Sequence, residues 1–503
     1  MSDVRATRKE WIGLAVIALP CILYSMDLTV LNLAVPSLIA TLNPSAAQLL
    51  WIVDIYGFFV AGMLLTMGTL GDRIGRRKLL LIGAAAFGIT SLLAAFAPTA
   101  ETLIVARALL GIAGATLAPS TLSLITNMFR NDRERTIAIS VWIASFSAGG
   151  ALGPVVGGVM LQYFWWGSVF LIAVPIMVLL LALGPWFLPE YKDPKAGRLD
   201  FVSAGLSIVA VLAVIYGIKS LAEGGDLLLS AGPILAGLVL GAIFVRRQLR
   251  LADPLLDLSL FARPSFSAAL AINVFGFFAM FGTFLVVAQY LQLVLGLTPF
   301  EAGLWSLPAG LGFTAGSLLT PKLLELMRPA YVLALGLVLA GAGLISMGYA
   351  GGERDLVLLV ISYGALSFGI APVATIAADL VVSGAPPERA GAASALNETS
   401  SELGGALGIA LLGSILTALY RAGLGDSLPA DLPGEAVAMA LRGIGGAHAA
   451  AEELPAGGLA LLEAARVAYA EAMLATALVS AAIVLVAALT SVMMFRRTGS
   501  ATA

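Results

Sequence analysis

The feature that most constrains this chain is a succession of long, almost uninterrupted apolar runs. A helix needs about 20 mostly apolar residues to cross the roughly 30 Å hydrocarbon core of a bilayer. The first run is too long for the core of a signal peptide and lacks a convincing cleavage site. By this rule the sequence predicts fourteen membrane-spanning helices, at residues 12–38, 48–70, 79–97, 101–123, 138–161, 167–188, 201–220, 230–246, 266–293, 302–324, 330–350, 355–379, 389–418 and 468–494.

Composition excludes the other fold classes. Hydrophobic residues make up 60% of the 503 residues, charged residues make up 12%, and the mean hydropathy is +0.99. Soluble domains are roughly 45–50% apolar and about 25% charged, so a soluble fold cannot bury this surface. A disordered chain is excluded for the same reason, and an outer-membrane barrel would show short alternating segments. The predicted fold class is an all-α polytopic membrane protein.

The distribution of Lys and Arg orients the spans, because cytoplasmic loops carry the excess of these residues. An even number of spans places both termini on the same side of the membrane. If both termini are inside, 22 of the 28 basic residues face the cytoplasm, five lie outside and Arg107 lies within a span. We therefore expect a multi-pass protein of the bacterial cytoplasmic (inner) membrane with both termini in the cytoplasm.

Charge and rare residues exclude several functions. The formal net charge is −2, which gives no reason to expect a nucleic-acid partner. Cys21 and His448 are the only cysteine and histidine, so neither an internal disulfide nor a multi-histidine or thiolate metal site can form. The sequence has no nucleotide-binding loop, and we expect no metal and no cofactor. A membrane-embedded enzyme or sensor is therefore disfavoured, and an ion gradient must supply the energy for any transport.

An internal repeat predicts the domain organisation. Three patterns recur in the same order at offsets of 253, 254 and 255 residues: Ala118-Pro119 as Ala371-Pro372, Glu134-Arg135 as Glu388-Arg389, and 149–153 as 404–408. Both copies face the membrane in the same direction, as in transporters built from two parallel six-helix halves with a substrate site between them. We predict a six-helix half at 1–190, two inserted helices with linkers at 191–262, and a second half at 263–503.

One predicted connection is much longer than the others. Residues 420–467 form an external segment that carries six acids and three arginines. One interpretation is a gate over an outward-facing vestibule. The other interpretation, a solvated linker between two spans, has equal support from the sequence.

Two motifs indicate close contacts between helices. A short cytoplasmic turn after the second predicted span combines glycines with charges that suit interhelical ion pairs, although such a turn can also be a simple topology anchor: Gly68, Asp72, Arg73, Gly75 and Arg76. In the fifth predicted span, glycines four residues apart allow another helix to pack backbone to backbone, and a proline can kink the helix. The residues of this second motif are Gly149, Gly153, Pro154, Gly157 and Gly158.

These motifs resemble those of a known family. The turn at 68–78 closely resembles the signature loop of the major facilitator superfamily, in which the aspartate at the position of Asp72 latches the cytoplasmic side of the outward-facing state. The run at 149–158 resembles the antiporter motif of drug–proton exporters. Residues 26–36 resemble the first-span signature of the fourteen-helix drug:proton antiporters, including QacA-like, SmvA-like and LfrA-like multidrug exporters. The second-half counterpart of the loop, at 321–329, is degenerate, which suggests two unequal cytoplasmic latches.

The resemblance implies a major facilitator fold with 14 transmembrane helices, made of two parallel six-helix halves plus two inserted helices. It further implies drug–proton exchange by alternating access. Intramembrane charges are the first functional candidates, because each costs about 2.5–3.5 kcal/mol even on lenient insertion scales. Asp27 and Arg107 are predicted at similar depths, and the segment that Arg107 begins resembles a family motif linked to proton transfer. We therefore predict that this pair couples transport to protons, with a static buried ion pair as the alternative.

Three further acids are predicted to recognise a cationic substrate. Asp54 lies six residues into the second span, where QacA-like cation exporters carry an acid, although an interfacial acid is an equal alternative. Glu398 lies near the midplane, and Glu402 lies one turn further along the same face of the helix. Their repeat equivalents, Ile143 and Ser147, are uncharged, so the acids are not a property of the repeat itself.

Aromatic residues complete the predicted site, because aromatic faces attract organic cations in a desolvated environment. A helix aromatic more often serves packing, and the candidates are Trp51, Tyr56, Trp142, Phe146 and Trp305. The sequence thus predicts a monomeric, proton-coupled exporter of lipophilic cations such as quaternary ammonium compounds, ethidium and acriflavine, with fluoroquinolones as further candidates. The alternative is the same fold exporting a neutral or anionic metabolite, lipid or peptide.

Overall fold

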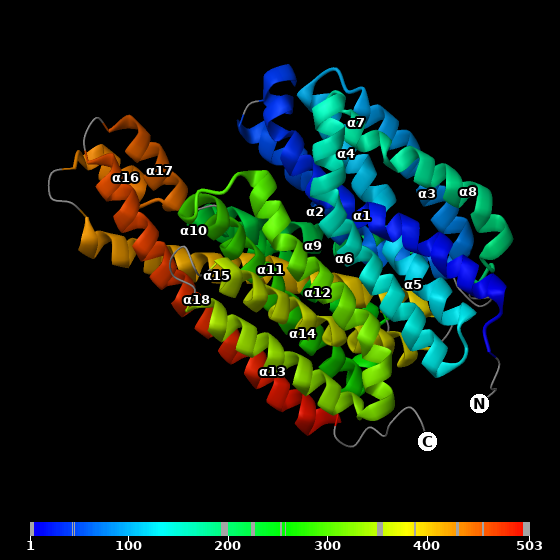
Figure 1. The fold of residues 1–503 in the computed structure, drawn as a ribbon. Helices are drawn as coiled ribbons and strands as arrows, with labels where there is room; N and C mark the ends of the chain where they lie inside the picture. The colour runs from blue at the N-terminus through cyan, green and yellow to red at the C-terminus, as the bar shows by residue number, and fades with distance from the viewer. Residues whose placement is uncertain are drawn as a thin grey trace.

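Long helices dominate the computed structural model, which describes residues 5–42, 44, 46–192, 200–222, 227–251, 254–256, 258–349, 356–386, 389–428, 432–454 and 457–495. Throughout these ranges every regular element is helical, as the hydropathy predicts. The helices run side by side along one long axis (Figure 1). The start of α1 and the end of α18 lie at the same end of the bundle, which is the end predicted to face the cytoplasm and is called the cytoplasmic end below (Figure 1).

Each predicted span coincides with one helix or with two consecutive helices. They are α1 (Arg8–Leu42), α2 (Ala46–Ile74), α3 (Arg76–Ala95), α4 (Ala100–Gly114) with α5 (Leu117–Met128), α6 (Asp132–Tyr163), α7 (Ser168–Leu171) with α8 (Ala173–Phe187), α9 (Phe201–Ala222), α10 (Leu227–Gln248), α11 (Pro264–Gln289), α12 (Pro299–Leu326), α13 (Pro329–Met347), α14 (Leu356–Ser383), α15 (Ala390–Ser427) and α18 (Gly458–Phe495). In the described ranges, thirteen helical segments are long and apolar enough to cross a membrane. The expected span that falls outside this group is α12, a helix of 28 residues.

The two repeats differ at equivalent prolines. The chain leaves the helical path between α4 and α5, just before Pro119. Proline has no backbone N–H and its ring clashes with the carbonyl four residues earlier, which here belongs to Ala115. The equivalent Pro372 lies inside the uninterrupted α14. The break packs against α3 at Gly83, where any Cβ would overlap the side chain of Thr116.

Glycines bring helices into backbone contact in both repeats. A Cβ on Gly149 of α6 would overlap the carbonyl of Ile22 in α1, and one on Gly157 would lie 2.9 Å from Val30. In the second repeat, Gly404 and Gly408 of α15 make the same kind of contact with the carbonyls of α11 residues. Gly153 is also buried, Gly158 has open space where a Cβ would lie, and the side chain of Pro154 lies outside the described part of the structure.

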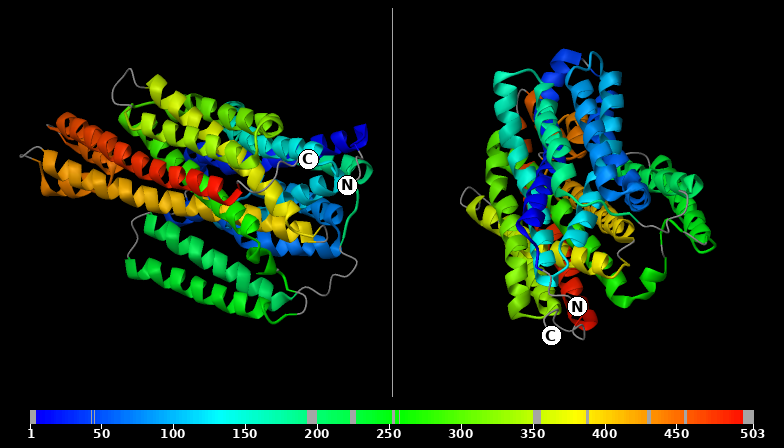
Figure 2. Two further views of the ribbon diagram at one scale, coloured as in Figure 1. Left: turned by 90° about the horizontal axis from the view of Figure 1, so that it is seen from below. Right: turned by 90° about the vertical axis from the view of Figure 1, so that its right-hand side faces the viewer.

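The inserted helices α9 and α10 form a pair beside the bundle (Figure 2, left). Of the two, α9 packs against both α2 and α15, while α10 packs mainly on α9. Asp200, just before α9, pairs with Arg247 of α10 at 2.8 Å and accepts a hydrogen bond from Ser203. Burial acts to raise the pKa of Asp200, but the hydrogen bonds from Ser203 and Arg247 outweigh it and hold this pKa below its ordinary value.

Much of the external segment 420–467 is helical. The helix α15 continues to Ser427, α18 already begins at Gly458, and two short helices lie between them, α16 (Gly434–Ala440) and α17 (Ile444–Glu453). Tyr420 donates a hydrogen bond to the carbonyl of Ala440 at 3.2 Å, which ties α15 to α16. At 1.5 Å per residue, the 38 residues of α15 extend about 57 Å, well beyond the hydrocarbon core. The segment therefore contains helices outside the hydrocarbon core, and the gate and linker interpretations both stay predictions.

Candidate functional site

Arg107 and Asp27 meet inside the bundle. Arg107 of α4 is 1% exposed, and its Nη1 lies 2.6 Å from Oδ2 of Asp27 on α1, whose side chain is 12% exposed. The guanidinium also donates from Nε to the carbonyl of Ile52 at 3.1 Å and from Nη2 to the carbonyl of Val53 at 3.4 Å. One arginine therefore joins α1, α2 and α4. The loss of one partner from such a pair leaves an uncompensated buried charge.

Tyr56 belongs to this ion pair and not to an accessible surface. The Cζ atom of Arg107 lies 4.8 Å from the centre of the Tyr56 ring and 5.9 Å from that of Phe170. Tyr56 is fully buried, and its ring contacts the guanidinium in this structure. An arginine over an aromatic face is stabilised by the negative face of the ring.

The remaining predicted aromatic contacts divide into two groups. Trp51 is exposed and stacks on Tyr216 of α9 with ring centres 6.4 Å apart, and Trp305 of α12 is also exposed. Trp142 and Phe146 of α6 pack edge to face inside the bundle, with ring centres 4.8 Å apart. Trp142 and Phe146 thus lie inside the bundle, whereas Trp51 and Trp305 have large surfaces on the outside.

Tyr24 joins Trp142 and Phe146 in an internal aromatic cluster. The ring of Tyr24 on α1 lies 5.6 Å from that of Phe146, edge to face. Trp142 donates from Nε1 to the hydroxyl of Thr121 at 2.9 Å, which fixes the indole. Sequence analysis missed Tyr24, although it lies one turn before Asp27 and therefore on the same face of α1.

The predicted acids on α15 lie close to this aromatic cluster. Glu402 and Glu398 are both within electrostatic range of Tyr24. Glu402 also interacts electrostatically with Tyr56, which contacts Arg107, so Glu402 approaches the Asp27–Arg107 pair from the second repeat. The side chain of Asp54 lies outside the described part of the structure.

A buried amide cluster positions the part of α15 that carries the acids. Asn273 of α11 is fully buried, and its Nδ2 donates to the hydroxyls of Ser400 and Ser401, each at 2.8 Å. Asn397 donates from Nδ2 to Oε1 of Glu398 at 3.2 Å. Asn273 was also missed, and the available signal was a lone amide in an otherwise apolar run.

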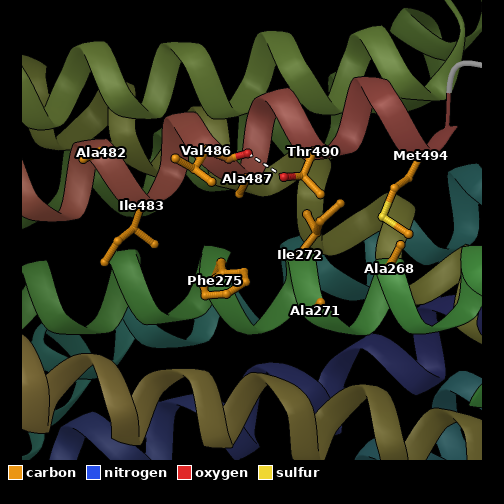
Figure 3. Close-up of a pocket in the computed structure, with 10 residues that line it drawn as sticks. All are labelled: Ala268, Ala271, Ile272, Phe275, Ala482, Ile483, Val486, Ala487, Thr490 and Met494. Carbon is orange, nitrogen blue, oxygen red and sulfur yellow. Dashed lines mark hydrogen bonds between the residues drawn. The ribbon is translucent and has the colours of Figure 1, made fainter.

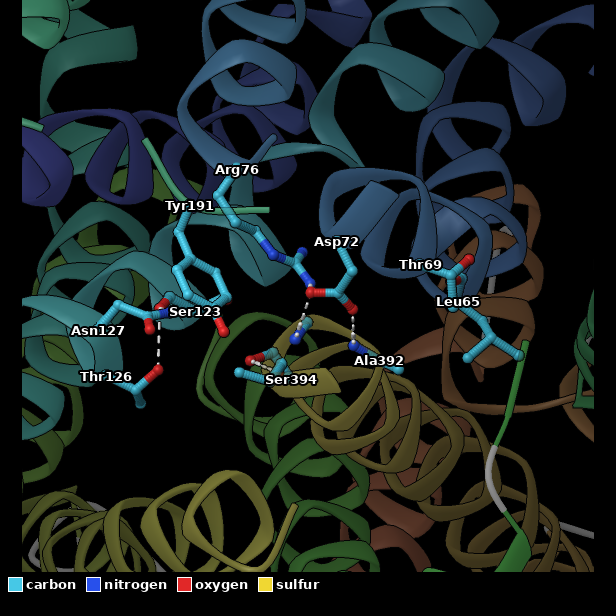
Figure 4. A network of polar contacts seen from close by, with 12 residues as sticks. Leu65, Thr69, Asp72, Arg76, Ser123, Thr126, Asn127, Tyr191, Ala392 and Ser394 are labelled. Atoms are coloured by element: carbon cyan, nitrogen blue, oxygen red, sulfur yellow. Dashed lines mark hydrogen bonds and ion pairs between the residues drawn. The ribbon is translucent and has the colours of Figure 1, made fainter. Parts of the chain in front are cut away.

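The glycine-containing turn closes the cytoplasmic end (Figure 4). Asp72 pairs with the fully buried Arg76 and accepts hydrogen bonds from the backbone N–H groups of Gly391 at 3.4 Å and Ala392 at 3.2 Å. These groups begin α15, and a carboxylate is stabilised at a helix N-terminus by the helix dipole. A Cβ on Gly68 would lie 2.6 Å from the carbonyl oxygen of Gly391, so α2 and α15 make close contact here.

Gly75 and Arg73 flank this contact. Gly75 has φ = 114°, a left-handed conformation that favours glycine, and it ends the turn before α3. Arg73 lies in the last turn of α2. A Cβ on Gly391 would overlap the guanidinium of Arg76, so the buried arginine requires a glycine on the opposite helix.

A second set of contacts joins α6 to the other repeat at the same end. Nε of Arg135 lies 3.0 Å from Oδ1 of Asp379, near the end of α14. Nη2 of Arg133 lies 2.7 Å from Oε1 of Glu325 in α12. By the 253-residue offset, Glu325 is the counterpart of Asp72. The side chains of Arg133 and Glu325 are 65% and 39% exposed, whereas Arg76 and Asp72 are buried. The two latches are thus unequal, as the degenerate second motif predicts.

Comparisons with known proteins place these features in a family context. Residues 17–409 match the family model described as Major Facilitator Superfamily. The multidrug efflux pump LfrA of Mycolicibacterium smegmatis is 42% identical over 99% of this chain and 98% of its own length. The methyl viologen resistance protein SmvA of Salmonella typhimurium is 36% identical over 92% of this chain and 93% of its own length. The methylenomycin A resistance protein of Streptomyces coelicolor is 32% identical over 78% of this chain and 83% of its own length.

Two solved structures share the fold at low sequence identity. The human organic anion transporter MFSD10 matches with a TM-score of 0.62 and 14% identity, over 96% of this chain and 99% of that chain. A bacterial homologue of the human lysosomal transporter Spinster, in an inward-facing conformation, matches with a TM-score of 0.58 and 19% identity, over 99% and 100%. At these identities the likeness concerns the fold alone.

Proposed function

The chain belongs to the major facilitator superfamily, and on this premise we propose that it is a proton-coupled antiporter that exports lipophilic cationic drugs. Members of this family are transporters and not enzymes, and the similar proteins include multidrug efflux pumps and resistance proteins. The protein therefore acts on small molecules from within a bilayer. We place it in the bacterial inner membrane as a monomer with both termini in the cytoplasm.

The observation that carries the cationic substrate class is the position of the α15 acids. Glu398 and Glu402 interact electrostatically with Tyr24, whose ring packs against Phe146, and Phe146 in turn packs against Trp142. Carboxylates beside aromatic faces attract a planar organic cation more strongly than a neutral molecule or an anion. The repeat equivalents of these acids are uncharged, so the acids serve a purpose other than folding of the repeat.

Coupling to protons follows from competition for carboxylates. In the cytoplasm-open state the drug cation pairs with Glu398 and Glu402. After the halves rock and the site opens to the outside, protons bind the acids and the drug leaves. Asp27 supports the second part of the cycle, because protonation of Asp27 breaks its ion pair with Arg107 and frees α1 from α4.

The name of one relative supports the proposal that the substrates of this protein include a dication. SmvA is named for resistance to methyl viologen, a flat dication. Two positive centres need two counter-charges along the path, and the chain offers Glu398 together with Glu402 or Asp54. Quaternary ammonium compounds, ethidium and acriflavine are the monocationic candidates, and fluoroquinolones are further candidates.

The test is efflux of ethidium from everted membrane vesicles with the pH gradient and the membrane potential clamped separately. We expect a pH gradient alone to drive transport in sodium-free buffer. Transport that requires sodium contradicts proton coupling. The matched measurement uses methyl viologen, an uncharged drug and an anionic dye, and preferential transport of the uncharged or anionic compound would favour the alternative cargo class.

A further inference from the structure

A groove on the outside of the bundle lies between α11 and α18, away from the proposed transport site (Figure 3). The cavity volume is about 360 Å³. Four alanines leave this space where the two antiparallel helices face each other: Ala268, Ala271, Ala482 and Ala487. Phe275, Val486 and Met494 extend as larger side chains around the same space.

The walls of the groove suit a hydrocarbon chain. Thr490 is the single lining residue with a polar side chain, and its hydroxyl donates to the carbonyl of Val486 at 2.8 Å. A polar ligand would lose its hydrogen bonds to water in this groove and find no partner, which is unfavourable. An apolar chain makes no such loss.

The groove spans one leaflet of the bilayer. From Ala482 to Met494 the helix rises about 18 Å at 1.5 Å per residue, which is close to half of the roughly 30 Å hydrocarbon core. Met494 lies one residue before the end of α18, and Ala268 lies near the start of α11, so this is the leaflet at the cytoplasmic end. Phe275 is 44% and Val486 is 64% exposed, so the groove opens outward to the lipid.

We propose that this groove binds one acyl chain of a cytoplasmic-leaflet anionic phospholipid, whose phosphate lies beside Arg263. Arg263 directly precedes α11, about one and a half turns from Ala268 toward the cytoplasmic end. Its side chain is exposed, and its Nη1 donates to the carbonyl of Gly384 at 2.5 Å. That bond fixes the guanidinium and leaves other N–H donors for a phosphate oxygen.

The groove lies behind the helix that positions the α15 acids. Ile272 forms part of the groove wall, and the next residue, Asn273, donates to Ser400 and Ser401. A bound chain therefore packs on the opposite side of α11 from the transport site. Because a ligand that binds only the folded state stabilises it, we expect the lipid to raise the melting temperature of the protein independently of transport.

The experiment uses the full chain in nanodiscs that contain a phosphatidylglycerol with a photoactivatable diazirine on its acyl chain. We expect peptides from α11 and α18 to be labelled several-fold above those of the lipid-facing α10, and unlabelled phosphatidylglycerol to compete. Ala271→Phe and Ala482→Phe fill the groove and should each lower the labelling at least fivefold. Ala242→Phe is the matched control, because Ala242 is an exposed residue of α10 at a similar depth and lies outside the groove.

Two lipid probes distinguish recognition of the lipid headgroup from binding of the acyl chain. Arg263→Gln should weaken labelling by phosphatidylglycerol and leave labelling by a matched phosphatidylcholine probe unchanged. Equal labelling of all lipid-facing helices, or labelling that survives both groove-filling variants, would overturn the proposal. If one of these variants does not fold, the other provides the same test. An unchanged result for Arg263→Gln would overturn the headgroup contact.

Discussion

At the scale of single residues, the Asp27–Arg107 pair carries the largest electrostatic consequence. Arg107 is 1% exposed, and among the described side chains it pairs with the carboxylate of Asp27 and donates hydrogen bonds to the carbonyls of Ile52 and Val53. A residue that couples transport to protons must serve every substrate, whatever the charge of the cargo. A residue that only stabilises the fold is not required for the coupling of transport to protons.

We expect Asp27→Asn to abolish uphill efflux of every substrate while drug binding persists. The variant should also be less stable, because breaking a buried pair costs about 3–5 kcal/mol. Asp27→Asn combined with Arg107→Gln removes both charges, so it should recover thermal stability without recovering gradient-driven transport. If purified Asp27→Asn protein in proteoliposomes still transports uphill, the coupling role is wrong.

Glu398 gives a prediction that depends on substrate charge. Glu398→Gln should weaken binding of a dication most, of a monocation less, and of an uncharged drug least, because each positive centre needs a counter-charge in a desolvated site. Adding Asp54→Asn should deepen the loss for the dication. Binding to the unaltered protein should weaken as pH falls, since protons compete with the drug for the carboxylates.

The measurement is the affinity of the single and double variants for a matched monocationic and dicationic pair across pH. Glu402→Gln, one turn away on the same helix, should show the same order of losses, because Glu402 is proposed to pair with the same cation. Equal losses for both drugs would assign Glu398 to coupling or structure instead of recognition.

At the scale of helices, the two cytoplasmic latches differ in burial. Asp72 binds the first N–H groups of α15 and a fully buried Arg76, whereas Glu325 binds Arg133 at an exposed position. A carboxylate at a helix N-terminus contributes about 0.3–2 kcal/mol. An exposed ion pair contributes about 0–1 kcal/mol and is screened by salt.

We therefore expect Asp72→Asn to shift the protein toward the cytoplasm-open state far more than Glu325→Gln. The probe is Ser394→Cys in a Cys21→Ser background, because Ser394 is fully buried beside the latch. A change of 1–2 kcal/mol should raise its labelling rate by a factor of roughly 5–30 in Asp72→Asn. Similar rates in the two variants would contradict the unequal-latch interpretation.

At the scale of the whole molecule, the inserted helices lie along the line where the two repeats meet. Leu212 of α9 packs against Gly62 of α2, where a Cβ would lie 3.0 Å from it. At the cytoplasmic end, the apolar cluster around Leu255 and Leu256 reaches Leu396 of α15. Rocking of the halves must break the contact of the inserted pair either with α2 or with α15. The contact between α9 and α2 is more extensive than that between α9 and α15.

We expect the inserted pair to move with α2 and to separate from α15 when the cytoplasmic end opens. In a Cys21→Ser background, a disulfide between Gly62→Cys and Leu212→Cys should leave efflux intact, because it joins parts that move together. A disulfide between Leu256→Cys and Leu396→Cys should block efflux, and reduction should restore it. The reverse pattern would show that the pair moves with α15.

The helices and the repeat could be predicted from the amino-acid sequence alone. Hydrocarbon offers no hydrogen-bond partners, so each spanning segment must satisfy its backbone internally, and an apolar run of sufficient length therefore predicts a helix with few alternatives. The expected spans coincide with helices for this reason. The sequence was less decisive for the external segment 420–467, because water outside the membrane can form hydrogen bonds with a non-helical backbone.

Which side chains meet depends on how the helices pack, and this could not be predicted from the sequence. A nearly all-apolar helix has little amphipathic pattern, so its sequence does not indicate which face packs on which neighbour. Depth along the membrane suggested that Asp27 and Arg107 pair, but nothing in the sequence placed Tyr56 on Arg107 or Tyr24 beside the α15 acids. Contacts such as Arg135 with Asp379, 244 residues apart, depend on how the helices pack, and packing is set by the fit of many side chains at once.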